Sequence, residues 1–481
     1  MKNMKKTFSI LFLFISSYLY GQQAINLDDV RNVGLYVVEI TTVDQEEPEG
    51  IFITKPGDEE WQNIIYKNKV PCRIVISRGE EVLYDSGPYV DNTSGATIRI
   101  TGNNSAYYSH PLNMPYKIKL EKASDLLFRG NDDIYKDKTW RLYKDAVNLN
   151  TITALKLSEV MEMEWTTAYV PCNVIINGDY RGYYLLTETM KRNAQCRVNC
   201  DKKKGYIVEK DAYWWKENKY FTSTWYKDDN VFRWTWKYPD EEDVTEDNEL
   251  YIKGYIERME ESLQQGNYED YIDLSSFAKW LLSHDVLGTD DTWGSNMFIK
   301  KYDETDQSRL ELPCLWDFDS SYLVPPGSFS NFHSMSNEYF KALMNSSNPS
   351  FREAYVKLWN DKKEDITNTL TTFLTEFEDS EEAKAIDASR QLHYKRWGTQ
   401  IGTINNNVDK TLGWINTHIP LLDKQIQSIA AGISDINESP RKTARQYYNL
   451  QGMKLNTAGN NSIVICRDAN GKTMKITKAL R

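Results

Sequence analysis

The first third of the chain alternates apolar and polar residues in short runs. The stretches GLYVVEI (34–40), CRIVISRG (72–79), TIRITG (97–102) and PYKIKLE (115–121) repeat with a period of two and are separated by Gly, Pro, Asn and Asp. A period of two places successive side chains on opposite faces of a strand. Residues 33–120 are therefore predicted to form β-strands joined by turns.

The pattern then changes to one of helical length and composition. NLNTITALKLSEVMEMEW (148–165) predicts a helix, and two strands, CNVIING (172–178) and GYYLLTE (182–188), follow it. These strands are joined by NGDYRG, whose Asn-Gly pair is a strong signal for a tight hairpin. KGYIVEKD (204–211) adds one further predicted strand.

Beyond these strands the chain becomes mostly helical. An aromatic insertion at 213–237 and an acidic run at 240–248 come before helical patterns that continue to residue 432, and residues 440–481 return to short strands. We therefore predict an α+β protein. It has a β-rich N-terminal region at 30–105, a domain at 106–432 with a helical C-terminal half, and a small C-terminal β module at 440–481.

The N-terminus has the features of a removed signal peptide. Three lysines precede the apolar stretch FSILFLFISSYLY, and Gly21 is a small residue suited to cleavage. We expect residues 1–21 to be removed and the mature protein to be secreted, in the periplasm or at the cell surface. No later segment is apolar enough for a transmembrane anchor. Losing the three lysines takes the formal net charge from −11 to −14, which argues against a nucleic-acid partner.

The six cysteines permit disulfides in an oxidising compartment. Cys196 and Cys200 lie close enough in sequence to pair, although spacing alone does not establish a bond. A zinc site is the weaker interpretation, because the chain has five histidines and none forms a ligand pair with these cysteines.

Two acidic stretches point to phosphoryl transfer. In SHDVLGTDDTWGSNMFIKK (283–301) a helical run gives way to a turn with Asp291 and Asn296, and LWDFDSSYL (315–323) follows one short hairpin later. Protein kinases use an Asp to position the attacking hydroxyl, and an Asn and a second Asp to hold magnesium. The alternative is that these Asp residues only cap turns. The apolar setting of Asp317 favours a bound cation, because an unpaired carboxylate is costly there.

Several blocks, in this order, resemble one known family. IRITGNNSAYYSHPLNMPYKIKLEKASDLL (98–127), VIINGDYRGYYLLTETMKR (174–192), LGTDDTWGSNMFIKK (287–301) and LWDFD (315–319) are similar to blocks of the CotH kinases. These are the spore-coat protein H-like atypical protein kinases, here in the form of exported Bacteroidetes proteins. The resemblance covers residues 33–430.

The resemblance implies an atypical, two-lobed protein-kinase-like fold that binds ATP with Mg²⁺ or Mn²⁺ and phosphorylates exported or surface proteins. By position in the motifs, Asp291 resembles the catalytic aspartate, and the metal ligands are expected to be Asn296, Asp317 and, secondarily, Asp319. Lys117, Lys119, Glu188, Gly102 and Asn103 are expected to bind the nucleotide. Either Glu159 or Glu162 is expected to pair with one of these two lysines, and the sequence does not choose between the two glutamates.

The chain also departs from the family pattern. RITGNNS keeps Arg99, Gly102 and Asn103 of a turn that usually carries a second arginine, Asn113 and Met114 replace a Lys-Lys pair, and Asn150 and Thr151 replace an Arg-Asn pair. A weak or inactive relative that acts as a surface scaffold is therefore the alternative.

Two further interpretations concern the insertion and the C-terminus. The aromatic residues at 213–237 also suit a carbohydrate-associated protein, since aromatic rings stack on sugars. The segment at 440–481 resembles C-terminal modules of exported proteins, some of which act as signals to a secretion machinery. Its alternative is an edge hairpin packed on the main domain.

Overall fold

The computed structural model describes residues 24–144, 149–228, 230–289, 295–322, 324–328, 337–398 and 402–438, together with four short strands between 446 and 477. The chain divides into two compact units, residues 1–423 and 424–481. The predicted signal peptide lies outside the described residues.

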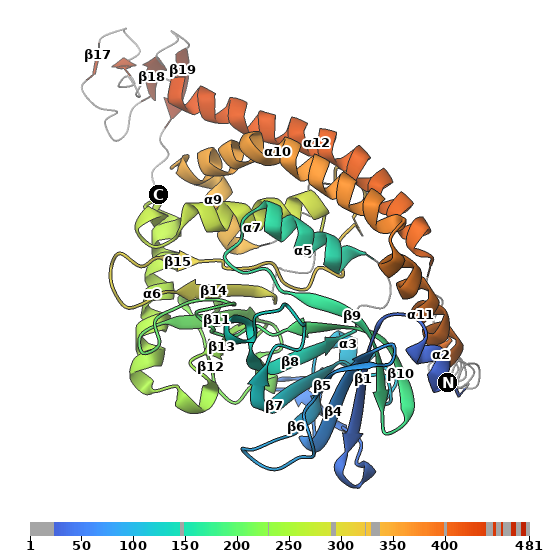
Figure 1. Ribbon diagram of the computed structural model, residues 1–481. Helices are drawn as coiled ribbons and strands as arrows, with labels where there is room; N and C mark the ends of the chain where they lie inside the picture. Colours follow the sequence, from blue (N-terminus) through green and yellow to red (C-terminus); the bar gives the residue numbers. More distant parts are fainter. Residues whose placement is uncertain are drawn as a thin grey trace, which may run out of the picture. The chain divides into compact units, whose positions relative to one another are not determined.

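Most of the predicted N-terminal strands belong to one barrel. Eight strands form a sheet in the order β1-β9-β10-β8-β7-β6-β4-β5, and a further pairing of β1 with β4 closes seven of these described strands into a ring (Figure 1). Because β6 pairs with β7, strands on both sides of residue 105 share this barrel. The strands of the sheet are β1 (Tyr36–Thr42), β4 (Val70–Arg78), β5 (Glu81–Asp85), β6 (Ala96–Ile100), β7 (Tyr116–Ser124), β8 (Asp137–Tyr143), β9 (Tyr169–Ile176) and β10 (Asp179–Glu188).

Alternation along each strand separates the barrel's interior from its outer face. In β7, the side chains of Tyr116, Ile118 and Leu120 are buried in the barrel core, Lys117 is half-buried and Lys119 is exposed. This confirms the period-two prediction for the strand. Burying one large apolar side chain contributes about 1.5–3 kcal/mol. The interior positions therefore fix the register, and a shift by one residue would turn the lysines inward.

The predicted hairpin between β9 and β10 is confirmed. Ile176 pairs with Asp179, which leaves a two-residue turn of Asn177 and Gly178. Both turn residues have positive φ angles, 53° and 77°. Asn-Gly suits this conformation because Gly has no Cβ and Asn tolerates left-handed backbone.

A second sheet follows in the order β12-β13-β11-β14-β15. The hairpin predicted before LWDFD is confirmed, because β14 and β15 pair antiparallel. The aromatic insertion supplies β12 and β13, and several of its rings, including Trp234 and Trp236, are buried in the protein. The strands are β11 (Tyr206–Asp211), β12 (Tyr220–Phe221), β13 (Arg233–Tyr238), β14 (Met297–Lys301) and β15 (Leu310–Glu311).

Helices make up the C-terminal part of the first unit. The helix α7 packs against α10 and α5, and α11 packs against β10 (Figure 1). The predicted end of α7 near Leu287 is confirmed, and Gly288 closes it in a left-handed conformation. The longer helices are α5 (Asn150–Val160), α6 (Glu246–Gln265), α7 (Leu274–Leu287), α9 (Glu338–Asn345), α10 (Ser350–Glu378), α11 (Glu381–Trp397) and α12 (Ile404–Glu438).

The helix α5 is shorter than the pattern at 148–165 predicted. Glu162 adopts a positive φ of 53°, and the amide of Met163 donates to the carbonyl oxygen of Ser158 at 3.1 Å. These contacts end the helix and turn the chain toward β9. Glu162 therefore lies beyond the helix.

Shorter elements connect these parts. A hairpin of β2 and β3 lies outside the barrel sheet. The short elements are α2 (Leu27–Arg31), η1 (Val43–Gln45), β2 (Gly50–Lys55), β3 (Asp58–Tyr66), α3 (Asn104–Tyr107), α4 (Asp132–Tyr135), η2 (Trp214–Lys216), η3 (Thr224–Tyr226), η4 (Glu241–Asp243) and η5 (Tyr268–Asp270).

The second unit contains a small antiparallel sheet in the order β17-β16-β18-β19. Its strands are β16 (Gln446–Tyr448), β17 (Lys454–Leu455), β18 (Ile463–Arg467) and β19 (Thr473–Thr477). Among the helices in the described ranges, none has the length and apolar composition needed to cross a membrane.

Candidate functional site

Three cations form a row across the outer face of the barrel. Arg99 on β6 lies opposite Lys117 on β7, and Lys117 lies opposite Arg141 on β8. Within the described residues, Lys117 makes no hydrogen bond or ion pair. Burial lowers the pKa of Lys117 to about 8; the charges of Arg99 and Lys237 lower it further, and the charge of Glu217, which forms no ion pair with Lys117, opposes them. A half-buried ammonium group without a carboxylate partner is a suitable position for an anion.

The second sheet contributes charged groups to the same region. Lys237 on β13 forms an ion pair with Glu209 on β11 at 2.9 Å. The other carboxylate oxygen of Glu209 accepts a hydrogen bond from the backbone amide of Asn296 at 3.2 Å. Glu209 is therefore neutralised by Lys237 and holds the residue before β14, while the charge of Lys237 acts on Lys117 from the opposing sheet.

Asp317 lies at the β8 end of the cation row. The hydroxyl of Tyr143 donates to Oδ1 of Asp317 at 2.8 Å. The guanidinium of Arg141, two residues before Tyr143, lies 4.4 Å from the Tyr143 ring centroid and 5.5 Å from that of Trp316. Asp317 Oδ2 has no hydrogen-bond partner among the described residues. One oxygen of this half-buried carboxylate is thus oriented by the protein and the other is available to a ligand.

Asn296 and Asp317 share an unusual backbone conformation. Their φ angles are 65° and 60°, in the left-handed region that non-glycine residues rarely adopt. Such conformations cost about 1–3 kcal/mol each and concentrate at functional sites. The two segments are packed together, since the Phe298 ring meets the Trp316 ring edge-on with centroids 5.7 Å apart.

Asn150 holds the turn that follows Asp317. Its side-chain amide donates to the carbonyl oxygens of Asp319 and Ser321, at 2.9 and 2.8 Å. Asn150, at the start of α5, therefore fixes this turn. The side chain of Asp319 is exposed. Asp291, the predicted catalytic residue, lies outside the described residues.

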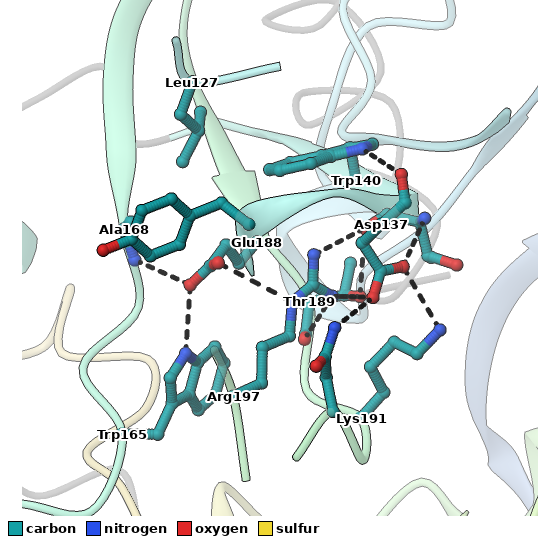
Figure 2. Close-up of polar contacts among 12 residues, drawn as sticks. Leu127, Asp137, Trp140, Trp165, Ala168, Glu188, Thr189, Lys191 and Arg197 are labelled. Atoms are coloured by element: carbon teal, nitrogen blue, oxygen red, sulfur yellow. Dashed lines mark hydrogen bonds and ion pairs between the residues drawn. The ribbon is translucent and has the colours of Figure 1, made fainter. Parts of the chain in front are cut away.

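Glu188 is held by protein donors on both oxygens. Oε1 accepts from Arg129 at 2.9 Å, and Oε2 accepts from the Trp165 indole at 3.0 Å and the Ala168 amide at 3.1 Å. Figure 2 shows the indole and the amide converging on this buried carboxylate. Glu188 lies opposite Trp140, on the barrel's inner side, whereas the cation row lies on the outer side.

Arg197 connects Glu188 to a second buried carboxylate, Asp137. The Arg197 guanidinium lies 3.7 Å from Glu188 and 3.8 Å from Asp137, and it donates to the carbonyl oxygen and hydroxyl of Thr189 (Figure 2). Lys191 also pairs with Asp137, at 3.2 Å. Arg197 precedes β11, so this buried network fixes the connection from the barrel to the second sheet.

The predicted partner of the lysine is not found at Glu159 or Glu162. Glu159 forms an ion pair with Lys156 at 2.8 Å, and Glu162 pairs with Lys362 at 2.6 Å. The prediction of a pair with a β7 lysine was wrong, because Glu159 pairs with a lysine of α5 itself and Glu162 lies beyond the end of α5.

Gly102 and Asn103 form a tight turn after β6. Gly102 has a φ of 90°, and a Cβ atom there would lie 2.6 Å from Oγ of Ser105. Only glycine therefore fits this position without displacement. The turn contacts Lys216, whose ammonium donates to the Gly102 carbonyl oxygen and to Oδ1 of Asn103.

The thiols of Cys196 and Cys200 are free, so the structure contains no bond between them. Cys200 and Cys314 both pack in the apolar cluster around Trp165. Burial raises the pKa of the Cys200 thiol to about 12, which makes it a poor nucleophile.

A small cavity of about 180 Å³ lies beside the start of α7. None of the residues predicted to bind the nucleotide or the metal lines it. Four carboxylates do, Glu162, Glu164, Asp273 and Glu311, together with Lys279. This charge is unsuited to phosphate, so we place the candidate site at the cation row and Asp317.

Sequence reasoning missed β8 and the second-sheet residues of the site. The signal for β8 was present, because Trp140 and Leu142 alternate with Arg141 and Tyr143. Glu209 and Lys237 carried no such signal, since only pairing between distant strands brings them to the row.

Asp211 gives the site a measurable pH dependence. It is 5 % exposed, and burial, with a smaller contribution from Glu209, raises its pKa to about 7. In the unfolded chain the same carboxyl has a pKa of about 3.9. Between about pH 4 and 7 the native state therefore holds a proton that the unfolded chain has released. The free energy of unfolding falls as the pH rises through that window, by up to about 1.4 kcal/mol per pH unit. Asp211→Asn should flatten the pH dependence of the free energy of unfolding between pH 5 and 8, measured by urea denaturation.

The matched control is Asp201→Asn. The pKa of Asp201 is lowered by hydrogen bonds from the amides of Lys203 and Lys204, so its contribution changes only below about pH 4. Equal pH profiles for wild type and Asp211→Asn would contradict the assignment.

The comparison with protein families identifies one match. The family model described as CotH kinase protein matches residues 98–419, two thirds of the chain. The matched range begins in β6 and includes Lys117, Asn296 and Asp317. The search of curated proteins found no similar sequence. The chain therefore belongs to the CotH kinase family, as its motifs predicted.

Proposed function

We propose that this protein is an atypical, two-lobed kinase that transfers phosphate from ATP to hydroxyl side chains of exported or surface proteins. Family membership supports a kinase-like protein. The observation that carries the proposal is Lys117, a half-buried lysine without an ion-pair partner among the described residues, flanked in register by Arg99 and Arg141.

A polyphosphate complements this arrangement. Three adjacent cations repel one another and pay a desolvation cost, which a bound anion offsets. Guanidinium groups bind phosphate oxygens with two parallel donors, and an ammonium group contributes a compact charge. In the proposed complex Lys117 lies between Arg99 and Arg141 at the phosphates, and Lys119, which is exposed, lies further along the same face.

The side-chain oxygen atoms at and near Asp317 suit a hard divalent cation as ligands. Magnesium prefers oxygen ligands and needs one or two carboxylates in addition to phosphate. Asp317 offers a carboxylate oxygen, and the Asn296 side chain is the second candidate ligand on a neighbouring segment. A bound Mg²⁺ or Mn²⁺ ion supplies charge neutralisation at the phosphates. Tyr143 orients Asp317 for this role through its hydroxyl.

Asp291 is the proposed acceptor of the substrate hydroxyl's proton. It precedes Asn296 by the four-residue spacing of a kinase catalytic loop. The N-terminal signal-peptide pattern supports action on exported proteins.

A scaffold without phosphate transfer is the second candidate function. Glu188 favours it, because both oxygens of this predicted nucleotide-binding residue accept hydrogen bonds from the protein. The activity test is incubation of the mature protein with labelled ATP and Mg²⁺ or Mn²⁺. Binding without transfer to itself or to any co-secreted protein would favour the scaffold.

The Lys117→Met variant tests the cation row. Removing one charge-assisted contact costs about 1.5–3 kcal/mol, so ATP should bind about 10- to 100-fold more weakly in calorimetry. Lys122→Met, an exposed lysine on the same strand, is the matched control and should retain wild-type affinity. Equal affinities for wild type and Lys117→Met would remove Lys117 from the site.

The Asp317→Ala variant tests the metal position. Magnesium-dependent ATP binding should be lost, because the remaining ligands do not hold the cation against the phosphates. Asp319→Ala should cause a smaller loss, since its side chain is exposed. Calorimetry with and without Mg²⁺ gives the comparison, and an unchanged magnesium effect in folded Asp317→Ala protein would contradict the assignment.

The Asp291→Asn variant separates binding from transfer. ATP affinity should stay within a few fold, whereas phosphate transfer should fall by about two orders of magnitude or more, the scale of losing a positioned acid-base group. Radiolabel transfer and calorimetry on the same preparation measure both quantities. Equal loss of both would identify Asp291 as a metal ligand.

A further inference from the structure

Lys216 reaches from the second sheet to the glycine turn. It ends η2 in the segment between β11 and β13, and its Nζ donates to the Gly102 carbonyl oxygen at 2.7 Å and to Oδ1 of Asn103 at 2.8 Å. Beside it, the hydroxyl of Tyr213 donates to Oδ1 of Asn104 at 2.9 Å. Two side chains of one segment therefore hold one turn.

The charge of Lys216 has no carboxylate partner at ion-pair distance among the described residues. An ammonium group has three donors, and neutral oxygens occupy two of them. Burial is the main cause that lowers the pKa of Lys216 to about 8; the charges of Glu217 and Asp211 oppose this shift, and the charge of Arg99 adds to it. Arg99 also lowers the pKa of Lys117. The charge of Arg99 therefore acts on both lysines.

We propose that Lys216 is an anion-binding residue that joins Arg99 and Lys117 in holding the phosphates of a nucleotide at the Gly102 turn. This inference rests on the proposed function and adds to it a residue from outside the barrel. The uncommitted third donor of Lys216 contacts a phosphate oxygen, while the other two keep the turn in place. The aromatic insertion thus supplies part of the nucleotide site and not only packing.

A purely structural role for Lys216 makes a different prediction. A side chain that only anchors the turn acts through its hydrogen bonds, as Tyr213 does, and its charge is irrelevant to binding. An anion-binding side chain acts through its charge, so arginine replaces it and the effect weakens with added salt.

The experiment measures binding of inorganic tripolyphosphate and of magnesium-ATP to the full chain by calorimetry, at low and high salt. Lys216→Met should weaken both about 10- to 100-fold and reduce the salt dependence, whereas Lys216→Arg should stay within about threefold of wild type. Tyr213→Phe should change affinity by less than about threefold, because it removes one neutral hydrogen bond and no charge. The matched control is Lys219→Met in the same segment, whose ammonium contacts the Val244 carbonyl oxygen.

The outcomes separate this inference from the proposed function. If the wild-type protein and Lys216→Met bind ATP with equal affinity, the role of Lys216 is overturned and the proposed function is left intact. Comparable losses in Tyr213→Phe and Lys216→Met show that the turn, not the charge, is responsible, and this also overturns it. Binding of tripolyphosphate that depends on Lys216, without binding of ATP, supports the anion site and overturns the nucleotide proposal. Binding of neither ligand by wild type overturns both.

Discussion

The pairing of β1 with both β4 and β9 closes the barrel, and the rest of the first unit depends on this closure. A closed sheet has one inner and one outer face, so each strand must place every second side chain outside the core. In β6, β7 and β8 those outer positions carry the cation row. The second sheet adds a further charge to this region, because Lys237 on β13 lowers the pKa of Lys117.

The charged groups of the barrel and the second sheet are organised by their partners. Glu209 is neutralised by Lys237, Glu188 and Asp137 share Arg197, and Lys117 is left without a carboxylate. Removing one partner of a buried pair is costly, so the Arg197 network fixes the position of the chain that enters β11. Glu209 is thereby committed to protein partners, while Glu217 acts on Arg99 and Lys117 through its charge. Lys117 itself forms no ion pair among the described residues, and the proposed binding of a polyphosphate anion depends on this.

Much of the fold could be predicted from the sequence because its signals were local. The period-two pattern of β7, the Asn-Gly turn after β9 and the end of α7 near Leu287 each depend on adjacent residues, and the structure contains all three. The predicted pairing of Glu159 or Glu162 with a β7 lysine was wrong, since Glu159 pairs with Lys156 on α5 and Glu162 lies beyond the end of that helix. The strand β8 was missed although its alternation was visible, and with it the link from Arg141 to Asp317.

The sequence by itself determined the family, the strand and helix periodicities and the residue types of the site, because motifs and amphipathic patterns are properties of contiguous residues. Only the tertiary structure decided which charges meet. Read along the chain, the turn at Gly102 lacks the second arginine that the family resemblance led us to expect, whereas in space Lys216, 114 positions later, brings an ammonium group to the Gly102 carbonyl oxygen. Such contacts arise from barrel closure and sheet packing, which depend on burying many distant apolar side chains together and leave no trace in local spacing.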